Sequence, residues 1–201
     1  MNKYNIEIIA HRGFWFDKFE KNSLKAFNLA IKKGFGIETD LRDLDGKFVI
    51  SHDPPIKTKE IIEFKNFLNI FKAKNKNLVL AINIKSDGIA KNIYDICLSE
   101  EISNFFIFDM SIPDLIYENQ LGCKNLFLRL SEYEDPSLIP TEAEGLWVDF
   151  FRGKLPKDIK LLESLNKYSK IAFVSPELHG HSVQLAEEFW LELNSFVKNN
   201  F

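Results

Sequence analysis

The sequence predicts an α/β protein, a compact (β/α)8 barrel of the TIM type with a hairpin-like excursion after the second strand. Eight short apolar runs are typical of buried strands, and most of them alternate with helical patterns. Charged or polar residues stand at the carboxyl ends of these runs, where the sites of such barrels lie. An open doubly wound sheet is the alternative. The barrel is favoured because every run, not only two neighbours at a switch point, delivers a polar residue.

Length and composition narrow the class of protein. A chain of 201 residues suits one buried core, so we expect a single domain over residues 1–201. The net charge of -3 points to no nucleic-acid or anionic-membrane partner, and no segment has the apolar length of a membrane span. Cys97 and Cys123 lack metal-type spacing and indicate buried thiols in a reducing compartment. With no signal segment in view, we expect a cytoplasmic protein without stable membrane association; its oligomeric state stays open.

The first quarter of the chain predicts a strand, a helix and a second strand. An apolar run at residues 6–10 ends at His11, Arg12 and Gly13, as a buried strand would deliver them. Asn22 or Ser23 then caps a helix that ends at Gly34. The apolar stripe of this helix is predicted to be Leu24, Phe27, Ala30 and Ile31.

The second strand, residues 36–40, carries two acids on one face, Glu38 and Asp40. Too few residues separate it from the next apolar run for a crossover to a parallel strand, and Asp45-Gly46 is turn chemistry. We therefore interpret residues 41–51 as a hairpin that returns and leaves His52 close to the two acids. Whether residues 48–51 also form a barrel strand stays open.

The remaining elements follow a regular rhythm. A helix is expected from about residue 59 to 71, with Ile61, Ile62, Leu68 and Phe71 on one side. Further strands are expected at residues 78–84, 105–108, 126–130, 146–151 and 171–174, with helices between most of them and one after Pro156. The buried stripe of the last helix is predicted to be Val183, Ala186, Phe189, Trp190, Leu193 and Val197.

Several motifs in order resemble the glycerophosphodiester phosphodiesterase family, within the phospholipase-C-like phosphodiesterases. They are HRG at 11–13, Asn22-Ser23 with Ala26-Phe27, and IETDLRDLDGKFVISHDP at 37–54. The resemblance implies a divalent metal, Mg²⁺ or Ca²⁺, held by Glu38 and Asp40, because carboxylate oxygens suit hard cations. It also implies that His11 and His52 act as general base and acid, in an order the sequence leaves open, with a cyclic phosphate formed first and then opened by water.

The chain also departs from the family pattern. The third metal acid of the family aligns with Asn83, whose amide oxygen can ligate a cation but adds no charge. Lys85 keeps its register and can hold a phosphate as a point charge. Where the family usually has Pro-Glu-Asn-Thr, residues 20–23 read Glu-Lys-Asn-Ser, so that acid is displaced or lost.

Further candidate substrate or phosphate ligands are Arg12, beside His11, and three residues at later strand ends, Arg129, Glu177 and His179. Ordinary ion pairs are the structural alternative for Arg129, and also for Glu38 and Asp40 with Arg12 or Arg42.

The leading functional hypothesis is metal-dependent hydrolysis of a small, soluble phosphodiester. Two alternatives stay open. The same site could stop at the cyclic phosphate, as a lyase or transferase, or the barrel could bind phosphorylated sugars or lipids without catalysis. Retention of both histidines favours catalysis, because a binder needs no acid/base pair.

Overall fold

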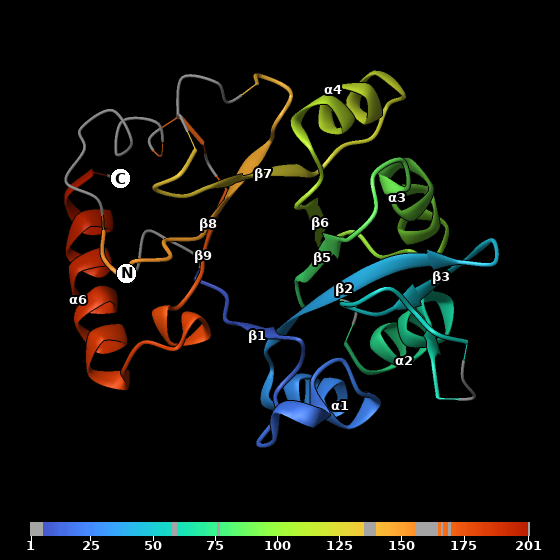
Figure 1. Ribbon diagram of the computed structural model, residues 1–201, viewed down its shortest axis with the longest axis horizontal. Coiled ribbons are helices and arrows are strands. Elements are labelled where there is room, and N and C mark those ends of the chain that lie inside the picture. Colours follow the sequence, from blue (N-terminus) through green and yellow to red (C-terminus); the bar gives the residue numbers. More distant parts are fainter. Residues whose placement is uncertain are drawn as a thin grey trace. The chain divides into compact units, whose positions relative to one another are not determined.

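The computed structural model describes residues 6–57, 60–75, 77–134, 140–155, 165, 167–168 and 170–200 (Figure 1). The chain divides into two compact units, Met1–Asn125 and Leu126–Phe201. Each unit has its own strands and helices and is described by itself. The expectation of one domain over the whole chain stays a prediction.

The first unit contains four parallel strands: β1 (Ile9–His11), β2 (Gly36–Leu44), β5 (Leu80–Ile84) and β6 (Phe105–Phe108). β2 pairs with β1 and with β5, and β5 pairs with β6. Helices α1 (Leu24–Lys33), α3 (Ala90–Ser99) and α4 (Ile112–Gln120) follow β1, β5 and β6, as the blue-to-green colouring of Figure 1 shows. Every residue of β5 and β6 is buried, as expected of parallel strands covered on both faces.

The predicted hairpin after the second strand is confirmed. β2 continues to Leu44, turns at Asp45-Gly46 and returns as the antiparallel β3 (Lys47–Ile50). Both turn residues have positive φ, 50° and 75°, which suits a two-residue turn with a glycine. At Leu41, β2 pairs with β5 on one edge and with β3 on the other. β1 pairs with the first residues of β2 and β3 pairs with the last ones, along the same edge of β2. β3 is therefore not one of the parallel strands.

The helix expected from about residue 59 begins later. Ile62–Glu63 form a short strand, β4, which pairs with β3, and helix α2 runs over Phe64–Asn75. The sequence-based start is wrong because Ile61 and Ile62, assigned to a helical stripe, precede the helix and Ile62 extends the hairpin sheet. Leu68 and Phe71 of the predicted stripe are buried, and aromatic rings complete this face: Phe67 packs on Phe64, Phe71 and Phe27, with ring centroids 4.7–6.3 Å apart.

The limits of helix α1 follow the predicted signals. The Ser23 hydroxyl accepts a hydrogen bond from the Ala26 N–H, and Gly34 ends the helix in the left-handed region at φ 76°. Phe27, Ala30 and Ile31 are buried as predicted. Leu24 is wrong as a member of the buried stripe: it lies in the first turn and is 39 % exposed, and Ala26 is buried instead.

The second unit contains three parallel strands, β7 (Leu126–Leu130), β8 (Gly145–Val148) and β9 (Ile171–Phe173). A 3₁₀ helix, η3 (Pro176–His179), follows β9 and leads to the long helix α6 (Val183–Asn200). The predicted helix after Pro156 lies largely outside the described residues. The stripe predicted for α6 is only partly right: Ala186, Phe189 and Leu193 are buried and Val197 is half-buried, whereas Val183 and Trp190 are 69 % and 40 % exposed.

Two expectations about composition can be compared with the structure. Cys97 and Cys123 are free thiols and both are buried, as predicted. Among the helices in the described ranges, none combines the length and apolarity needed to cross a bilayer.

Candidate functional site

Strand register in the first unit brings four predicted site residues onto one face. His11 on β1 is the partner of Glu38 on β2, and Asp40, two residues further along β2, is the partner of Asn83 on β5. Side chains at register partners in parallel strands, and at alternate positions of one strand, point to the same face. The structure therefore groups His11, Glu38, Asp40 and Asn83, which we call the acid cluster.

Cations surround the two carboxylates of the acid cluster. The Arg12 backbone N–H donates to Glu38 Oε2 at 2.9 Å, and His11 Nε2 lies 3.7 Å from the same oxygen. The Arg12 side chain turns to the other acid, with Nε 2.9 Å from Asp40 Oδ2. Lys85 Nζ lies 3.5 Å from Asp40 Oδ1. The ion pair of Asp40 with Arg12, weighed as the structural alternative, is thus present, while Glu38 meets the Arg12 main chain and the His11 imidazole.

Three oxygen atoms of the cluster are buried without a hydrogen bond. Glu38 and Asp40 are fully buried and Asn83 is 7 % exposed. Glu38 Oε1, Asp40 Oδ1 and Asn83 Oδ1 have no hydrogen-bond partner. Buried polar atoms normally have partners, since leaving them unpaired is costly. Two carboxylates and an amide oxygen on one face are the donor set that a hard divalent cation takes.

Within the described ranges, no group of three or more His, Cys, Asp or Glu residues is arranged to hold a metal ion. The acid cluster has two acids, and Asn83 stands where the resemblance implies a third. Its capacity for a cation therefore depends on an amide oxygen, as the sequence predicts.

Burial shifts two titrations in the cluster in opposite directions. Burial, together with the neighbouring charge of Asp40, raises the pKa of Glu38 to about 8. Burial, together with the positive charge of Arg12, lowers the pKa of His11 to about 4. At neutral pH the His11 imidazole is therefore neutral and able to accept a proton.

Asn22 is a residue of the site to which the sequence analysis gave no contact with the acids, only a place in a family-like motif and a possible helix cap. Its amide Nδ2 donates to Asp40 Oδ2 at 2.8 Å, and its Oδ1 accepts from the Thr39 hydroxyl at 2.9 Å. Its backbone N–H donates to the Arg12 carbonyl, and its φ of 58° lies in the left-handed region that asparagine tolerates. The signal available in the sequence was that Asn22 stands directly before Ser23, although Ser23 alone is enough to cap the helix.

Lys85 links the acid cluster to the next strand. Its ammonium lies 3.2 Å from Asp109 Oδ2, and Asp109 follows β6. Asp109 and Arg12, each following a parallel strand, have φ of 74° and 56°. Non-glycine residues rarely adopt this region, and such strained positions concentrate at functional sites.

His52 follows the returning strand β3 and contacts its own neighbour, Asp53. The Ser51 N–H donates to the Asp40 carbonyl, so the returning hairpin does reach the acid cluster. The His52 side chain is 45 % exposed, and its Nδ1 lies 2.9 Å from Asp53 Oδ1. The acid of the displaced family motif, Glu20, is also outside the cluster, in an ion pair with Lys25.

The other predicted ligands lie in the second unit, and each has a partner there. Arg129 Nε lies 3.2 Å from Glu134 Oε1, and the Glu177 carboxylate accepts from the Ser175 hydroxyl. His179 Nε2 contacts Asp149 Oδ1. Their role in substrate binding stays a prediction.

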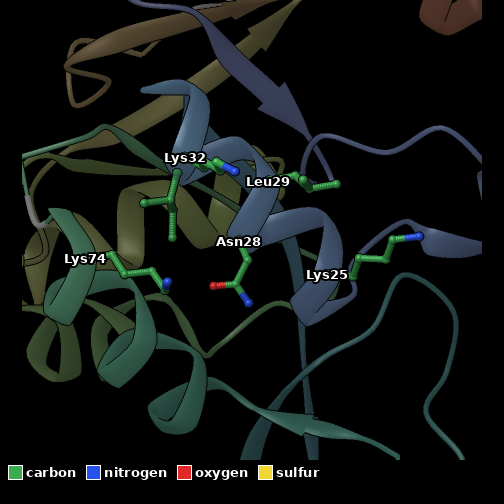
Figure 2. A pocket seen from close by; sticks show the side chains of 6 residues that line it. Lys25, Asn28, Leu29, Lys32 and Lys74 are labelled. Atoms are coloured by element: carbon green, nitrogen blue, oxygen red, sulfur yellow. The ribbon is translucent and has the colours of Figure 1, made fainter.

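A pocket of about 520 Å³ opens elsewhere on the first unit (Figure 2). It lies between α1 and α2 and contains none of the predicted site residues. It is lined by Lys25, Asn28, Leu29, Ile31, Lys32 and Lys74.

Comparison with solved structures relates this fold to one group of enzymes. A candidate glycerophosphodiester phosphodiesterase from Galdieria sulphuraria superposes with a TM-score of 0.72 at 16 % identity, over 93 % of this chain and 90 % of that one. The glycerophosphodiester phosphodiesterase of Agrobacterium tumefaciens gives a TM-score of 0.67 at 15 % identity, over 92 % of each chain.

No family model and no curated protein matches the sequence. The structural likeness extends over nearly the whole chain, and the predicted α/β class with its hairpin is confirmed. The chain thus has the fold of the glycerophosphodiester phosphodiesterases, the family that its motifs resemble.

Proposed function

We propose that this chain is a divergent member of the glycerophosphodiester phosphodiesterase family, an enzyme that hydrolyses a small glycerophosphodiester-like substrate with the help of a divalent cation. One observation carries the proposal. Three buried oxygens without hydrogen bonds lie on one strand face, beside a neutral imidazole and two cationic side chains. A purely structural ion-pair cluster has no need for buried oxygens that lack a hydrogen bond, as Glu38 Oε1 and Asn83 Oδ1 do.

Glu38, Asp40 and Asn83 would hold the cation, Mg²⁺ or Ca²⁺. Bound there, it would offset negative charge on the non-bridging phosphate oxygens. Arg12 and Lys85 carry fixed positive charge at the same place and would orient the phosphate. Both already compensate Asp40, which limits the net negative charge that the cluster presents to an anionic substrate.

His11 is the better placed of the two histidines to act as the base. Burial lowers its pKa to about 4, so at neutral pH the imidazole is unprotonated and its lone pair is available to an attacking hydroxyl, although the same shift makes it a weaker base than an ordinary histidine. His52, exposed and paired with Asp53, would return a proton to the leaving oxygen. Attack by a substrate hydroxyl vicinal to the phosphate would give a cyclic phosphate, which water would then open.

Arg129, Glu177 and His179 are proposed to select the alcohol of the substrate. We expect the enzyme to act in the cytoplasm and without a nucleic-acid partner, and the buried free thiols of Cys97 and Cys123 support a reducing compartment. A non-catalytic phosphate-binding role is the second candidate, favoured by the neutral amide of Asn83 where the family has an acid.

The test follows release of glycerol 3-phosphate from glycerophosphocholine by chelator-stripped protein to which Mg²⁺, Ca²⁺ or Mn²⁺ is added back. We expect metal-dependent release that His11→Ala and Glu38→Gln abolish. Glu118→Gln is the matched control: Glu118 is 1 % exposed and accepts the Lys91 N–H, far from the acid cluster in sequence, so this variant should stay active.

The other outcomes separate the alternatives. A cyclic phosphate that accumulates without opening would make the protein a lyase or transferase. Tight binding of glycerol 3-phosphate with no turnover under any metal would support the binding role and contradict the proposal.

A further inference from the structure

The segment that follows the HRG motif displays exposed aromatic side chains. We call residues 14–21, FWFDKFEK, the aromatic loop. Phe16 is 80 % exposed and Phe19 is 85 % exposed, which places both among the most exposed large apolar residues of the described ranges. The two residues stand three positions apart in one short loop, and exposed apolar side chains that gather in a patch mark interaction sites.

The aromatic loop is fixed by its own hydrogen bonds rather than by burial of these rings. The Asp17 carboxylate caps the 3₁₀ helix η1 (Lys18–Glu20) by accepting the Phe19 N–H at 3.0 Å. The Phe16 N–H donates to Glu20 Oε2 at 3.3 Å. The two phenylalanines are therefore held outward by an ordered turn.

Both ends of the aromatic loop are attached to the strand end that carries His11 and Arg12. Near its start, the Trp15 indole N–H donates to the His11 carbonyl at 2.9 Å. Just past its end, the Asn22 N–H donates to the Arg12 carbonyl at 2.9 Å. Whatever Phe16 and Phe19 contact is thereby brought next to the strand end that carries His11 and Arg12.

The surroundings of the aromatic loop are cationic although the chain as a whole is acidic. Residues 12–33 contain six Arg and Lys residues and two acids, in a chain of net charge -3. Both acids are engaged locally: Asp17 caps η1, and Glu20 pairs with Lys25. Lys18 lies over the Phe19 ring and Lys21 over the Trp15 ring, at 5.6 and 4.6 Å from the centroids.

The cationic surface continues along helix α1 into the pocket of Figure 2. Lys25, the partner of Glu20, lines this pocket together with Lys32 and Lys74, and the figure shows these side chains around Asn28. Within the described ranges, no ion pair is found for Lys32 or Lys74. Lys25, which pairs with Glu20 of the aromatic loop and also lines the pocket, is thus the residue that joins the two.

We propose that the aromatic loop docks the protein reversibly on an anionic lipid surface, so that amphipathic phosphodiesters reach the acid cluster from that surface. This inference rests on the proposed function. Aromatic rings flanked by lysines are the composition of interfacial contacts, because the rings enter the headgroup region while the ammonium groups remain at the phosphates. Two phenylalanines support reversible contact only, which agrees with the expected lack of stable membrane association.

The first arm of the test measures co-sedimentation of the protein with vesicles of phosphatidylcholine, with and without phosphatidylglycerol. We expect binding that needs phosphatidylglycerol and weakens with salt. The double variant Phe16→Ser, Phe19→Ser should bind about tenfold more weakly. The matched control is Val183→Ser with Leu191→Ser on α6, residues 69 % and 71 % exposed, and should bind as wild type.

The second arm follows choline release from two substrates, soluble glycerophosphocholine and 1-acyl-glycerophosphocholine embedded in the same vesicles. In both, water is added across one P–O bond and choline leaves. We expect the Phe16, Phe19 variant to keep its rate on the soluble substrate and to lose about tenfold on the embedded one. If the wild-type protein releases choline from neither substrate, the proposed function is refuted. The vesicle-binding arm would still test the docking surface in that case.

Wild-type protein that does not bind phosphatidylglycerol vesicles, or a Phe16, Phe19 variant that binds like wild type, would overturn the inference. Self-association that this variant abolishes, without vesicle binding, would overturn it in favour of contact between two copies of the chain.

Discussion

Asp40 and Glu38 differ in how the protein compensates them, although both are fully buried. Each has one carboxylate oxygen engaged and the other without a hydrogen bond. Asp40 meets a guanidinium, an ammonium and the Asn22 amide, whereas Glu38 has only the Arg12 N–H and His11. The difference explains why burial raises the pKa of Glu38 to about 8.

Asn22 is expected to position Asp40 for cation binding. Asn22→Gly keeps a residue that accepts φ 58° but removes the amide, and we expect about tenfold weaker metal activation, as for other groups that orient a ligand. Asn22→Asp places a second carboxylate beside Asp40 Oδ2 and should raise the pH at which the metal binds. Metal affinity is measured by calorimetry at several pH values.

The control for this prediction separates positioning from folding. Asn28→Gly removes an amide from helix α1, where Asn28 bonds only to a main-chain carbonyl in its own helix, and should lower stability while leaving metal affinity unchanged. Equal metal affinity in Asn22→Gly and wild type would contradict the positioning role.

At the scale of elements, the turn after β1 and helix α1 approach each other closely at Gly13. Gly13 has φ 82°, and a Cβ there would lie 2.7 Å from Ala26 Cβ and 2.8 Å from the Ala26 carbonyl carbon. The Phe14 N–H donates to the Ala26 carbonyl at the same place. The glycine of HRG therefore allows the turn that carries His11 and Arg12 to pack against the helix.

Gly13→Ala should destabilise the protein by more than Gly34→Ala does. Both residues have positive φ, 82° and 76°, so the backbone strain is similar, but a Cβ at Gly34 has no atom within 4 Å. The steric overlap at Gly13 should add about 1–3 kcal/mol. Urea unfolding of the two variants measures the difference, and equal stabilities would contradict the close-packing account.

For the whole molecule, two groups link stability to pH with opposite sign. In the folded metal-free protein Glu38 keeps its proton up to about pH 8, because its pKa is raised to that value. In the unfolded chain Glu38 has a pKa of 4.5 and loses the proton at lower pH. The free energy of unfolding therefore falls as the pH rises from 4.5 to 8. The pKa of His11 is about 4 in the folded protein and 6.5 in the unfolded chain. His11 therefore lowers the free energy of unfolding as the pH falls from 6.5 to 4. Between pH 6.5 and 8 only the Glu38 effect of these two remains.

We therefore expect metal-free protein to lose about 2 kcal/mol of stability between pH 6.5 and 8, and added Mg²⁺ or Ca²⁺ to restore it by stabilising the ionised carboxylate. Chemical unfolding with chelator and with metal, at both pH values, measures this. In Glu38→Gln the slope and the metal effect should disappear. A metal effect of equal size at both pH values would contradict the assignment.

Features that depend on local chemistry were determined by the sequence alone. Ser23 and Gly34 limit helix α1, Asp45-Gly46 turns the hairpin, and the order of HRG and the IETD segment predicts the fold. The cap and turn signals act over a few residues, where side-chain hydrogen bonds and allowed φ values decide the conformation, whereas the order of the motifs predicts the fold through a resemblance.

Other features were decided by the tertiary structure. The contact of Asn22 with Asp40 joins residues 18 positions apart, and the strand register that aligns Asp40 with Asn83 joins positions still more distant. Trp190 fits a buried helical stripe by periodicity, yet its indole N–H donates to the Ser175 hydroxyl at a half-exposed position. Such outcomes depend on which surfaces meet once strands have paired, and the pattern of a single segment does not contain that information.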